Sequence, residues 1–157
     1  MTAIIFGAML ILAPRMHAQF SDPASEPLSA MTVPQARLMQ AAELVRLLKT
    51  NGVDRPLMLQ VGSHVMFAQA HIPGSAYAGP GSQTAGLQLL EKAVASTSKN
   101  KMIVIYCGCC PWNHCPNIGP AYKRLRDLGF TNVKALYIAN NFGDDWANRG
   151  YPVDKGE

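Results

Sequence analysis

The sequence has few charged side chains, few aromatic ones and no clustered basic run. Charged residues make up 15% of the 157 residues and aromatic residues 8%, while 48% are hydrophobic. These proportions exclude a disordered chain, a coiled coil and a collagen-like fibre. The net charge of +4 is scattered, with no basic run longer than Lys123-Arg124, so we expect no nucleic-acid partner. The length is that of one domain with its own core.

The apolar run nearest the N-terminus, residues 3–13, is shorter than the roughly 20 residues that span a bilayer. It is typical of the central region of a secretory signal peptide, which we predict over residues 1–18. A membrane-tethering N-terminal anchor is the alternative. Residues 19–33 are rich in Ser, Pro and Ala, and we predict a linker or arm there. Cleavage would leave a secreted or periplasmic protein in an oxidising compartment, without stable membrane insertion.

Strands and helices are predicted to alternate from residue 38 to residue 150, within a folded domain that we place at residues 34–157. The predicted strands cover residues 57–61, 75–78, 102–106 and 133–138, and the predicted helices cover residues 41–50, 64–70, 84–96, 121–128 and 144–148. Residues 102–106 are apolar throughout, which is typical of a strand buried on both faces of a parallel sheet. The alternation predicts an α/β layer structure with a mostly parallel sheet.

All four cysteines lie in one short loop, CGCCPWNHC at residues 107–115, directly after the most apolar predicted strand. Ligands of parallel α/β sheets bind at the carboxyl ends of the strands, so this loop is the candidate site. Cys107 stands at the strand end and precedes a predicted helix N-terminus. Loop N–H groups and the helix dipole would stabilise an anion there, and we expect them to lower the pKa of the Cys107 thiol. Cys107 is therefore the candidate nucleophile.

The same loop contains ligand types for Zn²⁺ and Cu(I). Its spacing, C-x-C-C-x4-C, lacks the paired C-x2-C motif of structural zinc sites and the C-x-x-C-H motif of c-type haem. We assign no metal ligands and expect no cofactor. Residues 108–122 also contain no arginine, which argues against a phosphatase-type cysteine site.

Four segments together resemble the signature of rhodanese-like domains. They are Phe67–Ser75 with its His-Ile-Pro-Gly turn, Ile103–Cys107, Leu128–Val133, and Phe142–Trp146 followed by Gly150–Val153. The resemblance covers about residues 34–155. It implies a three-layer α/β/α fold around a central, mostly parallel five-stranded sheet.

The resemblance also implies a rhodanese-type sulfurtransferase with a persulfide on Cys107. Sulfane sulfur would come from a small donor of the thiosulfate or polysulfide type and pass to a thiophilic acceptor, such as a thiol or a protein. The cradle for the anionic sulfur would comprise Gly108, Cys109, Cys110, Trp112, Asn113, His114 and Cys115. Gln60-Val61-Gly62 stands where the family commonly has Asp-x-Arg, the loop lacks the family's arginine, and it is longer. We expect a monomer or weak dimer.

A second sulfur close to Cys107 could resolve a persulfide into a disulfide. Cys109, Cys110 and Cys115 are all candidate resolving thiols, because loop folding can bring each of them near Cys107. A structural disulfide among these three, leaving one free thiol, is equally compatible with the spacing. The alternative function is a non-catalytic module that binds a metal or forms a disulfide with a partner, or a dithiol–disulfide redox module.

Overall fold

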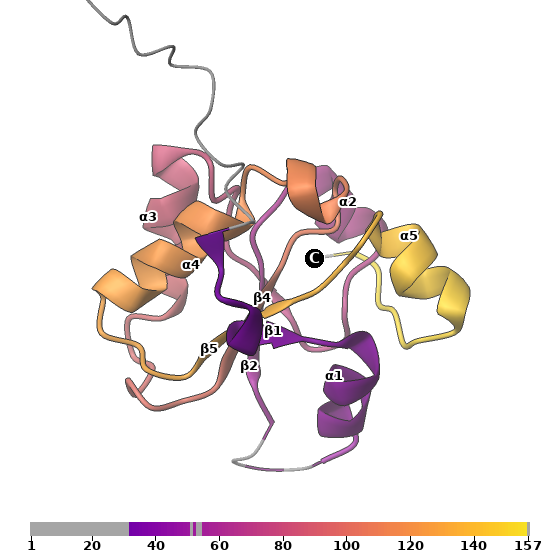
Figure 1. Cartoon of the computed structure of the whole chain (residues 1–157), viewed down its shortest axis with the longest axis horizontal. Coiled ribbons are helices and arrows are strands. Elements are labelled where there is room, and N and C mark those ends of the chain that lie inside the picture. The colour runs from indigo at the N-terminus through magenta and orange to yellow at the C-terminus, as the bar shows by residue number, and fades with distance from the viewer. Residues whose placement is uncertain (1–31, 51, 53–54, 157) are drawn as a thin grey trace, which may run out of the picture.

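One parallel sheet of five strands organises the protein (Figure 1). The structure is a computed structural model that describes residues 32–50, 52 and 55–156; the expected signal peptide and nearly all of the expected arm lie outside the described residues. The strands are β1 (Leu38–Met39), β2 (Leu57–Gln60), β3 (Ala76–Tyr77), β4 (Ile103–Tyr106) and β5 (Val133–Leu136). Their order is β1-β5-β4-β2-β3, and every neighbouring pair is parallel, which confirms the expected sheet.

Helices cover both faces of this sheet and complete the three layers. The helices are α1 (Ala41–Leu48), α2 (His64–Gln69), α3 (Thr84–Ala93), α4 (Ile118–Asp127) and α5 (Phe142–Asp145). In Figure 1, α3 and α4 lie on one side of the sheet, and α1 and α5 lie on the other. The helix α2 lies at the same end of the sheet as the short 3-10 turn Trp112–His114, which follows β4. Among the described residues, no helix has the length and apolar character needed to cross a membrane.

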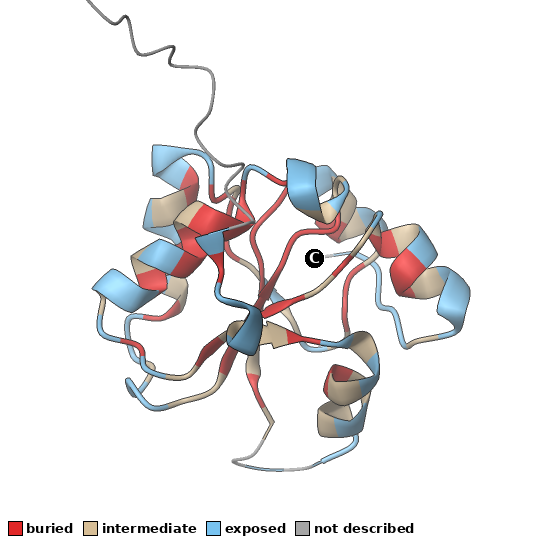
Figure 2. Cartoon of the chain, in the orientation of Figure 1, coloured by how far each residue is buried: buried red, intermediate tan, exposed pale blue. Residues whose placement is uncertain are grey.

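The strand β4 is central and fully buried, as its apolar sequence predicts (Figure 2). Ile103 and Ile105 belong to the core on the α3 and α4 side, while Val104 and Tyr106 belong to the core on the α1 and α5 side. A strand packed on both faces needs apolar residues at every position, because neither face meets water. This burial holds the end of β4 rigidly.

Two predicted helix boundaries were wrong at their N-terminal ends. The helix expected from residue 121 begins at Ile118 and includes Pro120 in its first turn. Proline is tolerated there because the first-turn N–H groups have no partner within the helix. The helix expected at residues 144–148 instead begins at Phe142, since the Asn141 side chain accepts the Asp144 N–H at 2.9 Å and caps it. The strand β1 was missed because Leu38 and Met39 are neither β-branched nor aromatic and so give no strand signal.

Two further segments pack against the core near the end of β4. The predicted turn at residues 71–74 is present, with Gly74 at φ +75. The Ile72 N–H in this turn donates to the Tyr106 hydroxyl at the end of β4, 3.1 Å away. Val33, in the region expected to be a linker, is buried in the core on the α3 and α4 side.

Candidate active site

The end of β4 places Cys107 inside the molecule, with only 4% of its surface exposed. Gly108 follows with φ +74, a conformation that glycine adopts without strain. A Cβ atom on Gly108 would lie 2.7 Å from the Phe142 Cβ, so a larger residue would collide with α5. The glycine thus lets the chain turn sharply after Cys107, and this turn brings Cys109 back toward it.

A second glycine, Gly62, lies just after the neighbouring strand β2 and leaves space for the Cys107 thiol. The Val61 N–H donates to the Tyr106 carbonyl at 2.8 Å, which continues the pairing of β2 and β4. A Cβ on Gly62 would then lie 2.8 Å from the Cys107 Sγ, closer than real Cβ contacts come. The Gly62 N–H donates to the buried Gln60 side chain at 3.1 Å. The segment that lacks the family's Asp-x-Arg charges is therefore the wall against which the thiol packs.

Asn117 supplies the polar contact to the candidate nucleophile. Its Oδ1 accepts from the Ser82 N–H at 3.1 Å and from the Ser82 hydroxyl at 2.8 Å. That fixes the orientation of the amide, so its Nδ2 donates toward the Cys107 Sγ at 3.4 Å and the Cys109 Sγ at 3.8 Å. Sequence reasoning missed Asn117. The available signal was a polar residue immediately before the helix that follows the cysteine loop.

The loop gathers its sulfur atoms around Cys107, and none of its four cysteines forms a disulfide. The Cys109 Sγ lies 3.1 Å from the Cys107 Sγ and 3.1 Å from the Cys110 Sγ. The Sγ atoms of Cys107, Cys109 and Cys115 all lie within 4.8 Å of one another. Thiolates suit Zn²⁺ and Cu(I), so these three residues could hold such an ion, a set that the spacing alone did not indicate.

The pKa values within this cluster differ from the sequence expectation. The pKa of the Cys107 thiol is raised, because it hydrogen-bonds to Cys109 and Cys115 and because it is buried. The pKa of Cys109 is lowered, because the Cys107 and Cys115 thiols both hydrogen-bond to it. The first amides at α4, those of Asn117 and Ile118, bond to the Cys115 sulfur rather than to Cys107. Negative charge is therefore favoured on Cys109 over Cys107, and Cys109 is placed to accept the Cys107 proton.

Several members of the predicted cradle face elsewhere. The N–H groups of Trp112, His114 and Cys115 donate to the carbonyls of Ala139, Pro111 and Trp112, respectively, at 3.0, 2.9 and 3.3 Å. Asn113 and His114 are exposed to solvent. Because the longer loop closes partly on itself, the contacts to Cys107 come from Asn117 and Cys109.

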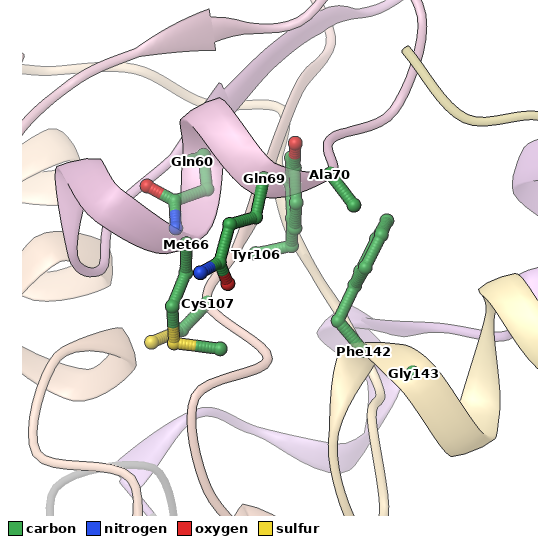
Figure 3. A pocket seen from close by; sticks show the side chains of 8 residues that line it. All are labelled: Gln60, Met66, Gln69, Ala70, Tyr106, Cys107, Phe142 and Gly143. Atoms are coloured by element: carbon green, nitrogen blue, oxygen red, sulfur yellow. The ribbon is translucent and has the colours of Figure 1, made fainter. Parts of the chain in front are cut away.

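Cys107 lines two separate cavities that share no other residue. The larger one, of about 190 Å³, is drawn in Figure 3 and is lined by Gln60, Met66, Gln69, Ala70, Tyr106, Cys107, Phe142 and Gly143. Met66 and Gln69 from α2 face Phe142 from α5 across it. The smaller one, of about 10 Å³, is lined by Cys107, Gly108, Cys110, Trp112, Cys115, Ile118, Leu136 and Ile138. Neither cavity has a charged side chain in its lining.

Comparison with known proteins places the fold of this site in a known family. The family model of the rhodanese-like domain matches residues 40–137. None of the curated proteins matches the chain.

Three solved structures illustrate the likeness of fold. The BH2092 protein from Bacillus halodurans is 24% identical, with 74% of this chain and 75% of that chain covered and a TM-score of 0.57. The Alr3790 protein from Anabaena is 21% identical, with 74% and 82% covered and a TM-score of 0.57. The anaerobic ergothioneine biosynthesis enzyme from Chlorobium limicola, in complex with trimethyl histidine, is 18% identical, with 74% and 27% covered and a TM-score of 0.55.

Proposed function

Since this chain belongs to the rhodanese-like domain family, we propose that it is a sulfurtransferase that carries sulfane sulfur as a persulfide on Cys107. One observation carries the proposal. Cys107 lines the cavity of about 190 Å³ at the carboxyl end of the central strand, whereas the other three cysteines do not. An incoming sulfur donor would therefore meet this thiol first.

The first step needs a proton acceptor, and Cys109 supplies it. The Cys107 proton passes to the Cys109 thiolate across the 3.1 Å between their Sγ atoms. The Cys107 thiolate then attacks the terminal sulfur of a donor such as tetrasulfide. The S–S bond of the donor breaks, its electron pair leaves on trisulfide, and Cys107 is left as a persulfide anion. The Asn117 Nδ2 stabilises negative charge on the Cys107 Sγ by hydrogen bonding.

The uncharged lining of the larger cavity favours a donor of the polysulfide type. Thiosulfate carries its charge on oxygen atoms that need strong hydrogen-bond donors or cations, and this lining has no Lys or Arg. A sulfur chain is more polarizable, and the Met66 thioether and the Phe142 ring offer it polarizable surface. The acceptor would be a thiol or another thiophile that enters by the same cavity.

A related solved structure supports the class of intermediate. The enzyme EanB has been solved with ergothioneine covalently linked to a persulfide cysteine; it is 18% identical to this chain, with a TM-score of 0.55. That protein shares the fold over 27% of its length, and a cysteine persulfide is the class of intermediate that we propose for Cys107.

The test adds tetrasulfide or thiosulfate to the protein in the presence of excess cyanide, which takes the sulfur from Cys107 as it arrives, and the thiocyanate formed without protein is subtracted. The persulfide anion transfers its outer sulfur to cyanide, which releases thiocyanate and regenerates the Cys107 thiolate. We expect thiocyanate from wild-type protein given tetrasulfide, about tenfold less with thiosulfate, and none from Cys107→Ser. Equal thiocyanate from Cys107→Ser and wild type would overturn the proposal.

A second candidate function rests on the cluster of thiols. The Sγ atoms of Cys107, Cys109 and Cys115 lie within 4.8 Å of one another, a spacing that three thiolates around one Cu(I) or Zn²⁺ ion can adopt. A metal-binding protein would hold one ion per chain by native mass spectrometry, would lose it to a chelator and would give no persulfide. Persulfide formation by metal-free protein would favour the sulfurtransferase.

A further inference from the structure

The arrangement of thiols around Cys107 bears on what becomes of the persulfide. We propose that Cys109 resolves the Cys107 persulfide into a Cys107–Cys109 disulfide and releases hydrosulfide, which makes the protein a persulfide reductase. This inference rests on the proposed function, because it begins from the persulfide on Cys107. It assigns to Cys109 a step that the sequence left open among three cysteines.

A short distance to Cys107 and partial exposure together favour Cys109; Cys115 also lies within 4.8 Å of Cys107 but is buried. Its Sγ lies 3.1 Å from the Cys107 Sγ, and a disulfide bond is about 2.05 Å long, so the two atoms need to approach by only about 1 Å. The Cys110 Sγ lies beyond Cys109, 3.1 Å from the Cys109 Sγ. Its thiol also donates to the His114 carbonyl at 3.6 Å. The turn at Gly108 keeps Cys107 and Cys109 facing each other.

The step balances in atoms and electrons. Cys109 gives its proton to solvent, the outer persulfide sulfur takes a proton from solvent, and the Cys109 thiolate attacks the Cys107 Sγ. A new S–S bond forms between the two cysteines. The persulfide S–S bond breaks, and its electron pair leaves on the outer sulfur as HS⁻. The two cysteines are oxidised together by two electrons, and the sulfane sulfur is reduced to sulfide.

The two cavities give this step the geometry that displacement at sulfur requires. The nucleophile attacks in line, opposite the leaving sulfur. Cys107 lines the cavity of about 190 Å³ and Cys109 does not, so an outer sulfur in that cavity points away from the attacking thiol. The same cavity is wide enough for HS⁻ to depart. The smaller cavity, at about 10 Å³, has no space for an outer sulfur.

Asn117 is positioned to assist both halves of the exchange. Its Nδ2 faces the Cys107 Sγ at 3.4 Å and the Cys109 Sγ at 3.8 Å, so one donor stabilises the anion on either sulfur. The two Ser82 bonds to Oδ1 hold the amide in that orientation throughout.

Turnover requires an external reductant, which we assign to the class of dithiols. A dithiol attacks the disulfide, forms a mixed disulfide and closes into its own disulfide, returning two thiols to the protein. Cys109 is the accessible end of the pair, because it is half-buried while Cys107 is buried. Attack at the Cys109 sulfur is therefore expected.

The experiment compares full-length wild type with Cys109→Ser and its matched control Cys110→Ser, each treated with tetrasulfide under non-reducing conditions. Serine nearly preserves the size of the side chain. The readouts are intact mass, peptide mapping and sulfide released per chain. Wild type and Cys110→Ser should lose two hydrogens, map a Cys107–Cys109 disulfide and release about one sulfide. Cys109→Ser should gain one sulfur on Cys107 and release less than about one-tenth of that sulfide.

The outcomes separate failure of this inference from failure of the proposed function. A stable persulfide on Cys107 in both wild type and Cys109→Ser would overturn the resolving role and leave the sulfurtransferase intact. A disulfide from Cys107 to Cys110 or Cys115 in wild type would also overturn it. If wild type forms neither a persulfide on Cys107 nor a disulfide between Cys107 and another cysteine, the proposed function itself fails. Peptide mapping of wild type decides the matter even if a variant does not fold.

Discussion

The two cavities that meet at Cys107 differ in size and in chemistry. One has a volume of about 190 Å³ and is lined by side chains from β2, α2, β4 and α5. The other has a volume of about 10 Å³ and is lined in part by Cys110, Trp112 and Cys115. A substrate fits only the first, and another cysteine of this chain approaches Cys107 from the side of the cysteine loop. A buried thiol can therefore face a substrate cavity on one side and a second thiol of the same chain on the other.

The two sides also differ in how they stabilise charge. The larger cavity has no charged lining, so recognition there depends on shape and polarizability. On the side of the cysteine loop, the Cys107 Sγ accepts a hydrogen bond from the Asn117 Nδ2 at 3.4 Å. It also forms a hydrogen bond with the Cys109 Sγ at 3.1 Å. The polar contacts of the nucleophile come from within the protein, while the substrate side contributes none that is charged. The following predictions perturb the two sides separately.

The largest effect should come from filling the space beside the thiol. In Gly62→Ala, the new Cβ would lie 2.8 Å from the Cys107 Sγ and would displace it from the position it needs. We expect persulfide formation to fall by about 100-fold, as displacements near 1 Å do at catalytic groups. The measurement is the initial rate at which Cys107 is modified, as a persulfide or as the Cys107–Cys109 disulfide, by mass spectrometry. Ser63→Ala, at an exposed neighbour, should load like wild type; equal rates in Gly62→Ala would contradict this packing.

The next effect should come from removing the donor on the side of the cysteine loop. Asn117→Asp keeps acceptors for the two Ser82 bonds but replaces the Nδ2 that faces the Cys107 Sγ. Loss of a hydrogen bond to a charged sulfur should slow loading about 10- to 100-fold at neutral pH. The apparent pKa of the rate should move upward, because the thiolate loses a stabilising donor and gains a nearby carboxylate.

A matched substitution separates this charge effect from structural damage. Asn117→Ala removes the donor and also leaves the Ser82 N–H without its acceptor, so it should lower the free energy of unfolding by about 1 kcal/mol. Urea unfolding should find Asn117→Asp closer to wild type than Asn117→Ala. A pH–rate profile unchanged in both variants would contradict the role of the Asn117 Nδ2 in stabilising the Cys107 thiolate.

A smaller effect should come from adding a charge on the substrate side. Gln69→Lys places an ammonium at the mouth of the larger cavity, where Gln69 is exposed. Attraction of about 1 kcal/mol in a solvated site corresponds to about a fivefold gain in thiosulfate loading at low salt. Val65→Lys is the control, since Val65 is 65% exposed on the same helix and lies outside the cavity lining. Equal gains in both variants would mean that the charge acts on the whole surface.

The smallest effect on sulfur transfer should come from removing the Tyr106 hydroxyl, next to Cys107 in the chain. The Tyr106 hydroxyl accepts the Ile72 N–H at 3.1 Å and bonds with the Ser75 hydroxyl at 2.8 Å. Tyr106→Phe should lower the free energy of unfolding by about 1–2 kcal/mol and leave sulfur loading within about twofold.

The pH dependence of that stability follows from the tyrosine itself. Burial raises the pKa of Tyr106 to about 12. Its neutral form is favoured in the folded state, so its contribution is complete below the unfolded pKa of about 10 and is lost as pH rises toward 12. Urea unfolding should show the advantage of wild type over Tyr106→Phe at pH 7 and little of it at pH 12. An advantage that persists at high pH would contradict the assignment.

The sequence predicted the sheet, the turn at residues 71–74 and the location of the cysteine loop, because these depend on local patterns. The contacts around Cys107 depend on residues far apart in the chain, and no local pattern reports them. Asn117 is oriented by Ser82, which lies 35 positions away, and Gly62 meets Cys107 only through the pairing of β2 with β4. The expected lowering of the Cys107 pKa was wrong for the same reason, since Cys109 and Cys115 decide which sulfur holds the charge.

The measurement that tests the central claim most directly is a crystal structure of Cys109→Ser after treatment with tetrasulfide. Without the resolving thiol, the added sulfur should remain in place long enough to be seen. We predict one extra sulfur atom on the Cys107 Sγ, directed into the cavity between Met66 and Phe142. An added sulfur on Cys110 or Cys115, or an unmodified Cys107 in fully treated protein, would contradict the account.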